Sequence, residues 1–306
     1  MFSDTHLESF QRDGCAVIAD FISPEQIATL RQRIDELLRS FDPADHPLTT
    51  FATGQSQQQQ PDIHIGDQYF FDSADKTSFF LEEGAIDRGG SGRLTVDAPH
   101  AINKIGHGLH LTEPVFAELT HSAPIKDIAK KLEYQDPRVL QSMVICKQPG
   151  IGGAVPWHQD STFLFTQPLS ACGFWLALED CTLDNGCLEY IPGSHLTTPV
   201  TRRFVRKADN SGTEMVDIAK GDSIEFAVAE DPSSSYGCVS GGSGGVPIEV
   251  AAGSLVLING QVLHRSSRNY SSKSRWIYTF HIVEGAAAYD QRNWLQMPAG
   301  AELTKL

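Results

Sequence analysis

The sequence predicts a mainly β fold with flanking N-terminal helices. Two amphipathic segments with helix spacing lie within the first 135 residues, and short apolar runs bounded by glycine, proline and asparagine follow from Arg138 onward. Such runs are typical of an antiparallel sheet, and the preceding helices are expected to pack against it. With 306 residues, the chain can bury a substantial core.

The first helix is predicted to begin after Ser23. This serine, with Pro24 and Gln26, makes a cap, a first-turn proline and a capping box. Asp42 and Pro43 end the helical pattern. Apolar residues recur at helix spacing through the segment, namely Ile27, Leu30, Ile34, Leu37, Leu38 and Phe41.

A second helical region is predicted over about 112–134, with a break at Pro124. Its apolar stripe consists of Ile125, Ile128, Ala129 and Leu132.

Between the two helical regions, the glutamine-rich stretch 54–61 has the composition of a loop. A glycine- and serine-rich insertion occupies 233–245, and we expect these two loops to form a mobile lid over a site.

The strands are predicted within five apolar runs bounded by turn residues. These runs are "RVLQSMVICKQPG", "GFWLALEDCT", "GCLEYIPGSH", "GSLVLING" and "RWIYTFHIV". They lie between Arg138 and Val283, without any internal repeat. An antiparallel sheet built from these runs brings residues from distant parts of the sequence together.

The charge balance excludes two classes of partner. The chain carries 38 acidic and 24 basic side chains, for a formal charge of −14. Binding to nucleic acid or to an anionic membrane surface requires a positive field, so neither is expected. The cluster Arg202, Arg203, Arg206 and Lys207 could receive a carboxylate or a coenzyme A phosphate, but an ordinary solvated basic segment is the favoured interpretation.

The six cysteines include no CxxC pair, so reduced thiols are expected rather than a zinc ribbon or a disulfide scaffold. The first residues contain no apolar run that resembles a signal peptide, and no segment has the roughly 18 apolar residues of a membrane span. A cytoplasmic location is therefore expected. Peroxisomal import is the alternative, because Thr304-Lys305-Leu306 is related to the Ser-Lys-Leu address.

The stretch "AVPWHQDSTF" at 154–163 contains a candidate metal site. Residues i and i+2 of a strand point to the same face, so His158 and Asp160 could present an imidazole and a carboxylate side by side. A second histidine from a neighbouring strand would complete the two-histidine, one-carboxylate triad that binds Fe(II) and leaves coordination positions open. Without that histidine, the pair is as readily explained as a polar turn.

Three downstream histidines could be the third ligand. His264 is favoured, because Ser266 follows it and Arg275 opens the next apolar run, so that a ligand, a hydroxyl and a guanidinium are expected on two adjacent strands. An arginine there could bind the distal carboxylate of a small chelating diacid. His195 lies in the tight turn "IPGSH", which favours a structural role. His281 shares a strand face with Arg275 and could line the cavity, although a satisfied core histidine is the preferred interpretation.

At these residues the chain resembles the phytanoyl-CoA dioxygenase family of Fe(II)- and 2-oxoglutarate-dependent oxygenases. The likeness extends over nearly the whole sequence, in several separate matches in the same order. These are "FQRDGCAVIADFIS", "INKIGHGLH", "VLQSMVICKQP", "HQD", "NGCLEYIPGSH", "YTFH" and "NWLQ". The glutamine run and the glycine-serine insertion depart from the family pattern.

The resemblance implies a double-stranded β-helix, the jelly-roll, cupin-like barrel, as a single domain over 1–306. Within it, 1–135 would be a helical part with a lid loop, 136–285 the core with a loop insertion at 201–250, and 286–306 a tail. The implied iron ligands are His158, Asp160 and His264. The implied 2-oxoglutarate contacts are Arg275, Ser266, Lys104, Met143 and Trp175.

The resemblance also implies the reaction, in which Fe(II), 2-oxoglutarate and dioxygen serve to hydroxylate a C–H bond of a small organic substrate with release of succinate and carbon dioxide. Asp160 makes halogenation improbable, because halogenating relatives in the wider superfamily replace this carboxylate by a small residue. Two alternatives remain open at this point. One is a zinc- or manganese-dependent hydrolase or isomerase on a cupin barrel, and the other is a non-catalytic module that binds metal or 2-oxoglutarate.

Overall fold

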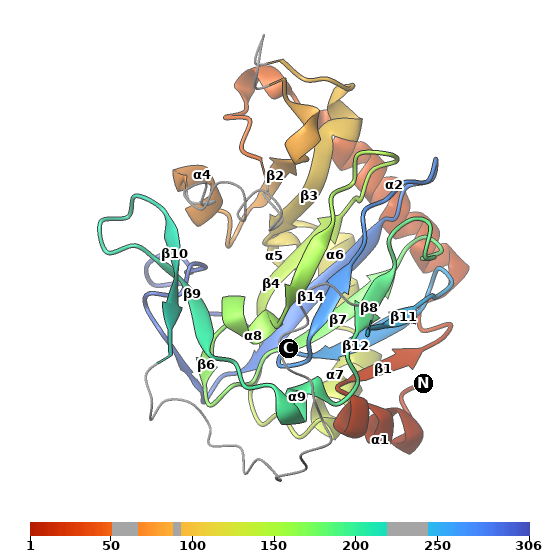
Figure 1. Cartoon of the computed structure of the whole chain (residues 1–306), viewed down its shortest axis with the longest axis vertical. Helices are drawn as coiled ribbons and strands as arrows, with labels where there is room; N and C mark the ends of the chain where they lie inside the picture. Colours follow the sequence, from red (N-terminus) through yellow and green to blue (C-terminus); the bar gives the residue numbers. More distant parts are fainter. Residues whose placement is uncertain (51–66, 88–92, 219–243) are drawn as a thin grey trace.

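The computed structural model describes residues 1–50, 67–87, 93–218 and 244–306. The fold centres on a large antiparallel sheet in the order β1-β12-β7-β14-β4-β3-β2, with β16 paired to β4 (Figure 1). Its strands are β1 (Cys15–Ile18), β2 (Thr77–Leu81), β3 (Ile102–His107), β4 (Pro137–Ile145), β7 (Cys172–Ala177), β12 (Leu255–Asn259), β14 (Ile277–Glu284) and β16 (Thr304–Lys305).

A second, smaller antiparallel sheet lies against the first in the order β11-β8-β13-β5. Its strands are β11 (Val246–Ile248), β8 (Leu188–Tyr190), β13 (His264–Ser266) and β5 (Val155–His158). Two further short pairs are formed by β9 (Arg202–Arg206) with β10 (Thr213–Asp217) and by β6 (Thr166–Gln167) with β15 (Ala288–Tyr289). The paired sheets agree with the predicted jelly roll, although within the described residues hydrogen bonding does not close them into one continuous barrel.

The large sheet is buried on both faces, as β14 shows. Tyr278 and Phe280 point to the outer face, where they join a core cluster with the helices, whereas Thr279 and His281 line a cavity on the inner face. Successive side chains of a strand alternate between the two faces, so one strand serves both the core and the cavity. The cavity therefore lies between the two sheets.

The predicted helices are present on the outer face of the large sheet (Figure 1). Helix α2 (Pro24–Ser40) begins at Ser23, whose hydroxyl accepts a hydrogen bond from the Gln26 amide at 3.2 Å. The second region consists of separate helices, because Pro124 opens a new one. The remaining helices are α1 (Asp4–Asp13), α4 (Gln68–Phe71), α5 (Leu109–Thr112), α6 (Pro114–Thr120), α7 (Ala123–Lys131), α8 (Asp160–Phe163) and α9 (Ser194–Thr197).

The division of the chain differs from expectation at three places. Residues 1–135 are not only helical, since β1, β2 and β3 belong to the large sheet. The described ends of the expected 201–250 loop form the β9–β10 hairpin and β11. Within 286–306, β15 and β16 are paired strands rather than a free tail. Except in the β9–β10 hairpin, whose strands are close in sequence, the pairing partners of β1, β15 and β16 are too distant in sequence for local patterns to reveal the pairing.

The glutamine-rich stretch 54–61 and most of the insertion at 233–245 lie outside the described residues. Thr304 and Lys305 pair with β4, and the Leu306 amide donates to the Pro137 carbonyl at 3.0 Å. A receptor that reads an extended tail would have to break this pairing.

In the described segments, every helix is too short or too polar to cross a bilayer.

Candidate active site

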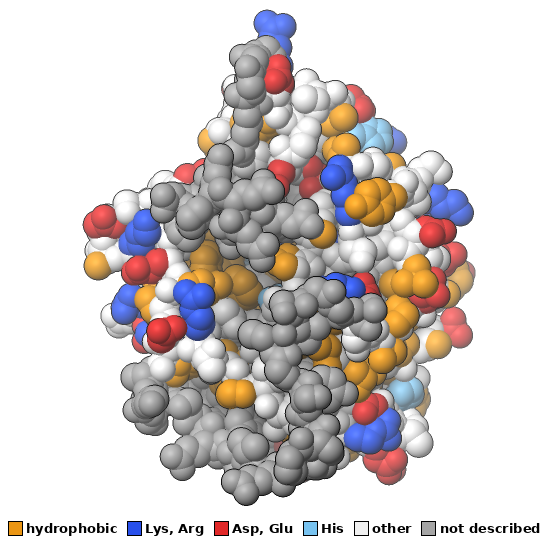
Figure 2. Space-filling view, viewed as in Figure 1, with side chains coloured by type: hydrophobic (Ala, Val, Ile, Leu, Met, Phe, Trp, Pro, Cys, Tyr) orange, Lys and Arg blue, Asp and Glu red, His pale blue; other side chains and the backbone are white. Residues whose placement is uncertain are grey.

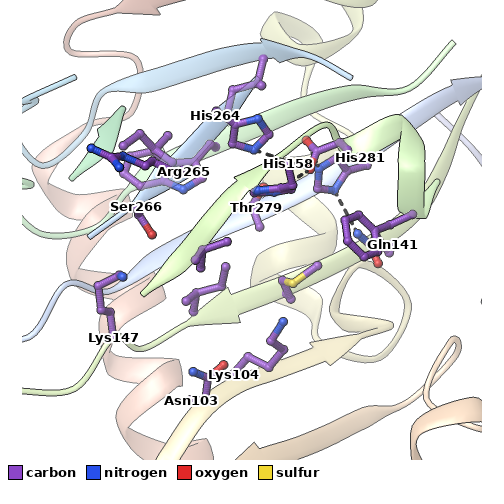
Figure 3. A pocket seen from close by; sticks show the side chains of 18 of the residues that line it. Asn103, Lys104, Gln141, Lys147, His158, His264, Arg265, Ser266, Thr279 and His281 are labelled. Atoms are coloured by element: carbon purple, nitrogen blue, oxygen red, sulfur yellow. Dashed lines mark hydrogen bonds and ion pairs between the residues drawn. The ribbon is translucent and has the colours of Figure 1, made fainter. Parts of the chain in front are cut away.

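A cavity of about 250 Å³ lies between the two sheets, and all the predicted site residues line it. These are His158, Asp160, His264, Arg275, Ser266, Lys104, Met143 and Trp175. The space-filling view shows a hollow with hydrophobic side chains at its floor on this side of the molecule (Figure 2). Residues from both sheets surround the space (Figure 3).

The two favoured histidines meet across neighbouring strands. His158 ends β5 and is paired in register with His264, the first residue of β13. Asp160 was expected on the same strand, but it is the first residue of the short helix α8. Gln159 between them keeps an extended backbone, with φ −114° and ψ 130°, and its side chain donates to backbone carbonyls outside the cavity wall. His158 and Asp160 therefore still point to the same side.

The three side chains direct one potential ligand atom each toward a common point, with all three atoms within 4.8 Å of one another. Nε2 of His158 lies 3.5 Å from Oδ1 of Asp160, and Nε2 of His264 lies 3.6 Å from the same oxygen. The Nδ1 atoms face the carbonyls of Pro156 and Val262 at 2.9 and 3.1 Å. Because a carbonyl only accepts, each Nδ1 carries the proton and each Nε2 keeps its lone pair for a metal.

The protonation states also suit a metal. Burial would raise the pKa of Asp160, but the neighbouring His264, His281 and His158 more than reverse this effect, so the pKa lies well below its ordinary value. Burial lowers the pKa of His264 to about 4, and the neighbouring His158 ring adds to this effect. An ionised carboxylate faces a neutral imidazole at neutral pH, which is the state that metal binding requires.

Arg275 reaches the cavity from the large sheet, two residues before β14. The expectation that it shares adjacent strands with His264 and Ser266 is wrong, because β13 belongs to the smaller sheet. The guanidinium is buried over the Trp175 ring, 5.4 Å from its centroid, and Nη1 donates to the Gly186 carbonyl at 2.7 Å. Its Nε has no partner among the described residues. This buried cation therefore keeps a donor for an anion.

Further charges gather at the Arg275 end of the cavity. Strand register places Lys104 opposite Ile145, which in turn is opposite Ile277 near Arg275. Burial lowers the pKa of Lys104 to about 7, partly offset by Glu82. Lys147 also lines this end, where its ammonium donates to two backbone carbonyls. Burial, and next the charge of Arg275, lower the pKa of Lys147 well below its ordinary value. The positive charge at this end therefore comes mainly from Arg275 and in part from Lys104, and it suits an anionic ligand.

The opposite end of the cavity is aromatic. Phe70 and Trp294 are stacked with ring centroids 4.4 Å apart, and His107 lies edge-on to Trp294 at 5.1 Å. The ring centroid of Phe163 lies 6.0 Å from that of His158 and 5.5 Å from that of Phe204. The aromatic end of the cavity therefore begins beside the predicted metal ligands. The three predicted ligands therefore separate a charged end from an apolar end.

The two rival histidines have different positions. His195 is on α9, where Nε2 faces the Gln11 carbonyl at 3.0 Å, and it does not line the cavity. His281 does line the cavity, and its Nε2 lies 3.1 Å from Oδ2 of Asp160. It is buried and hydrogen-bonded, as expected of a core histidine, but its partner is a predicted ligand.

Sequence reasoning missed Gln141 and Lys147 as cavity residues. Gln141 lies two residues before Met143 on β4, and its side-chain amide contacts His281 at 3.2 Å. The period of two along the strand was the available signal, since Gln141, Met143 and Ile145 all line the cavity. Lys147 follows the end of β4, and no spacing rule distinguished it from a solvated lysine.

The basic cluster near 202–207 is largely engaged by other groups. Arg202 pairs with Asp217 at 3.5 Å, and Arg203 pairs with Asp290 at 2.7 Å. Arg206 stacks on a phenylalanine ring and donates to two backbone carbonyls. These contacts favour a structural role for the three arginines over a receiving site for phosphate.

Comparison with known sequences identifies close relatives. Residues 10–277 match the family model described as phytanoyl-CoA dioxygenase. The chain is 40% identical over 300 residues to phytanoyl-CoA dioxygenase domain-containing protein 1 of Danio rerio, covering 97% of this chain and 95% of that protein. It is 42% identical over 291 residues to the phytanoyl-CoA dioxygenase of Arabidopsis thaliana, covering 95% and 92%.

Solved structures share the fold at low sequence identity. The epimerase SnoN in complex with Fe3+, alpha ketoglutarate and nogalamycin RO has a TM-score of 0.59 and 15% identity, covering 98% of this chain and 91% of that one. EctD from S. alaskensis, solved with 2-oxoglutarate and 5-hydroxyectoine, has a TM-score of 0.56 and 21% identity, covering 92% and 76%.

Proposed function

The chain belongs to the phytanoyl-CoA dioxygenase family, and from this premise we propose that it is an Fe(II)- and 2-oxoglutarate-dependent dioxygenase that hydroxylates a C–H bond of a small organic substrate. The observation that carries the proposal is the position of His158, Asp160 and His264 between a charged and an aromatic end of one cavity. Both SnoN and EctD, which share the fold, were solved with this kind of co-substrate.

The three side chains fit Fe(II). Two neutral imidazole nitrogens and one carboxylate oxygen form the donor set of non-haem iron oxygenases, and the hydrogen bonds at Nδ1 fix both imidazoles with Nε2 toward the common point. Three protein ligands leave further positions for small molecules. His158, Asp160 and His264 would therefore hold the metal in this proposal.

The charged end fits 2-oxoglutarate, which is a dianion at neutral pH. Arg275 and Ser266 would bind the carboxylate remote from the metal, since the buried guanidinium keeps an unpartnered N–H and the hydroxyl lines the same space. Lys104 would add a positive charge, while Met143 and Trp175 would pack against the carbon chain. Desolvation of Arg275 makes its interaction with a carboxylate stronger than it would be in water.

When bound, iron and 2-oxoglutarate supply the oxidising chemistry, with succinate and carbon dioxide as products. The protein's own residues position the reactants and exclude water. Trp175 and Ile258, both buried, form apolar walls around the cavity. Phe163, Phe204 and Trp294 would receive an uncharged part of the substrate beside the metal ligands.

The same geometry favours an oxygenase over the alternatives. A hydrolase or isomerase would use the metal as a Lewis acid and has no need for a dicarboxylate-binding end beside it. A non-catalytic module would be expected to lose a ligand or close its cavity, whereas here all three ligand atoms converge beside a cavity of about 250 Å³.

The test is 2-oxoglutarate turnover by the purified protein. With Fe(II) and oxygen, the protein should convert 2-oxoglutarate to succinate, and a metabolite extract should contain a compound that gains one oxygen atom. Zinc-loaded protein is the control, because zinc occupies similar ligands without redox chemistry. Succinate formation that is equal with zinc, or absent with iron in a folded protein, would contradict the proposal.

A further inference from the structure

A row of three residues crosses the large sheet beneath Asp160. Gly173 on β7, His281 on β14 and Gln141 on β4 are register partners, side by side on adjacent strands. Both polar side chains line the cavity, and Figure 3 shows His281 between Gln141 and the predicted metal ligands. His281 is not part of the group of converging ligand atoms.

The direction of the hydrogen bonds follows from the groups involved. Nε2 of His281 lies 3.1 Å from Oδ2 of Asp160, and an ionised carboxylate only accepts, so Nε2–H donates. The side-chain nitrogen of Gln141 lies 3.2 Å from Nδ1 of His281 and donates to it. Gln141 thereby fixes the tautomer of His281 that has its proton on the side of Asp160.

The two oxygens of Asp160 consequently have different surroundings. Oδ1 faces Nε2 of both His158 and His264, whereas Oδ2 is occupied by His281. Gly173 leaves the room for this contact, because a Cβ there would lie 3.2 Å from Nε2 of His281 and 3.5 Å from Oδ2. The carboxylate is therefore oriented with a single oxygen toward the ligand histidines.

We propose that His281 is a positioning residue that holds Asp160 as a one-oxygen metal ligand, with Gln141 and Gly173 fixing His281 in turn. The proposal rests on the proposed metal site and extends it by one residue. Outer-shell hydrogen bonds of this kind orient the ligand, and their loss commonly costs roughly 10- to 100-fold in metal affinity.

The test uses Co(II) as a probe, read by direct titration and by its visible spectrum. His281→Leu removes the donor, so Co(II) should bind about 10- to 100-fold more weakly, with an altered spectrum. His281→Gln can place an N–H near the position of Nε2, so it should restore affinity to within about threefold. His195→Leu is the matched control, because it removes an equally buried histidine hydrogen bond away from the cavity.

Gly173→Ala is a second perturbation that keeps both polar side chains. The added methyl group should displace His281 and weaken Co(II) binding about tenfold. Unchanged affinity in His281→Leu and Gly173→Ala would overturn the proposal. So would a glutamine variant as weak as the leucine variant, which would indicate that His281 binds the metal itself. Wild-type protein that binds no Co(II) would instead contradict the proposed metal site.

Discussion

His158 and His264 lie directly opposite each other on β5 and β13, with ring centroids 4.1 Å apart. This pairing joins two distant parts of the sequence at one point, and Asp160 completes the group from the start of α8. The position of each ligand histidine is thus set by backbone pairing and by an Nδ1–H bond to a carbonyl.

His264→Ala should abolish iron-dependent turnover and weaken Fe(II) binding by more than about 100-fold. The loss of a hydrogen bond to a metal ligand can already weaken metal binding by about 100-fold, and this variant loses the ligand itself. His195→Ala should keep both, because His195 bonds the Gln11 carbonyl outside the cavity. Metal titration and succinate assays on the two variants check the prediction. The reverse pattern would show that the third ligand is wrongly assigned.

Arg275→Ala should weaken 2-oxoglutarate binding while leaving Fe(II) binding intact. A hydrogen bond to a charged group contributes about 1.5–3 kcal/mol, which corresponds to roughly 10- to 150-fold in Kd. Arg203→Ala serves as the control, since that arginine pairs with Asp290 instead. Calorimetric titration of the metal-loaded protein measures the change, and equal affinity in the two variants would exclude Arg275 as the anchor.

The affinity for 2-oxoglutarate should depend on pH through Lys104. Burial lowers the pKa of this ammonium to about 7, and a bound dianion would raise it again. The protonated lysine attracts the ligand, so affinity should be full below pH 7 and fall above it, by at most about tenfold per pH unit. Lys104→Met should remove the dependence. Titration between pH 6 and about 9 checks this, and a wild-type profile that stays flat would contradict it.

Phe280→Ala should destabilise the fold by about 3–5 kcal/mol, because the ring is fully buried and a cavity would remain. Phe280 is stacked on Phe174 with centroids 4.8 Å apart, on the outer face of the large sheet. Tyr270→Ala, at a residue 79% exposed, should change stability by no more than about 0.5 kcal/mol. Denaturant unfolding of both variants measures the difference, and similar values would contradict the assigned core.

Local sequence patterns predicted where helices and strands form better than they predicted which strands pair. The cap at Ser23, the break at Pro124 and the apolar runs have local causes, and all three were confirmed. The placement of β1–β3 in the large sheet could not be predicted, because pairing between distant strands leaves no mark on spacing. The separation of His264 and Arg275 into different sheets was missed for the same reason.

The site was anticipated where a residue type was chemically distinctive. A histidine and a carboxylate two residues apart suggested a metal, although Asp160 proved to open a helix rather than end a strand. His281 was expected to be a core residue, because its sequence context does not reveal the carboxylate that it meets. Its contact with Asp160 depends on α8 and β14 lying together, which only the tertiary structure shows.

The most direct test of the proposed site is anaerobic. Fe(II) is added to the metal-free protein, followed by 2-oxoglutarate, and the visible absorption is recorded before oxygen is admitted. The proposal predicts a charge-transfer band from the iron–2-oxoglutarate chelate in the wild-type protein and in His195→Ala, but not in His264→Ala. If the folded, iron-loaded wild type gives no band, then His158, Asp160 and His264 do not form a 2-oxoglutarate-dependent iron site.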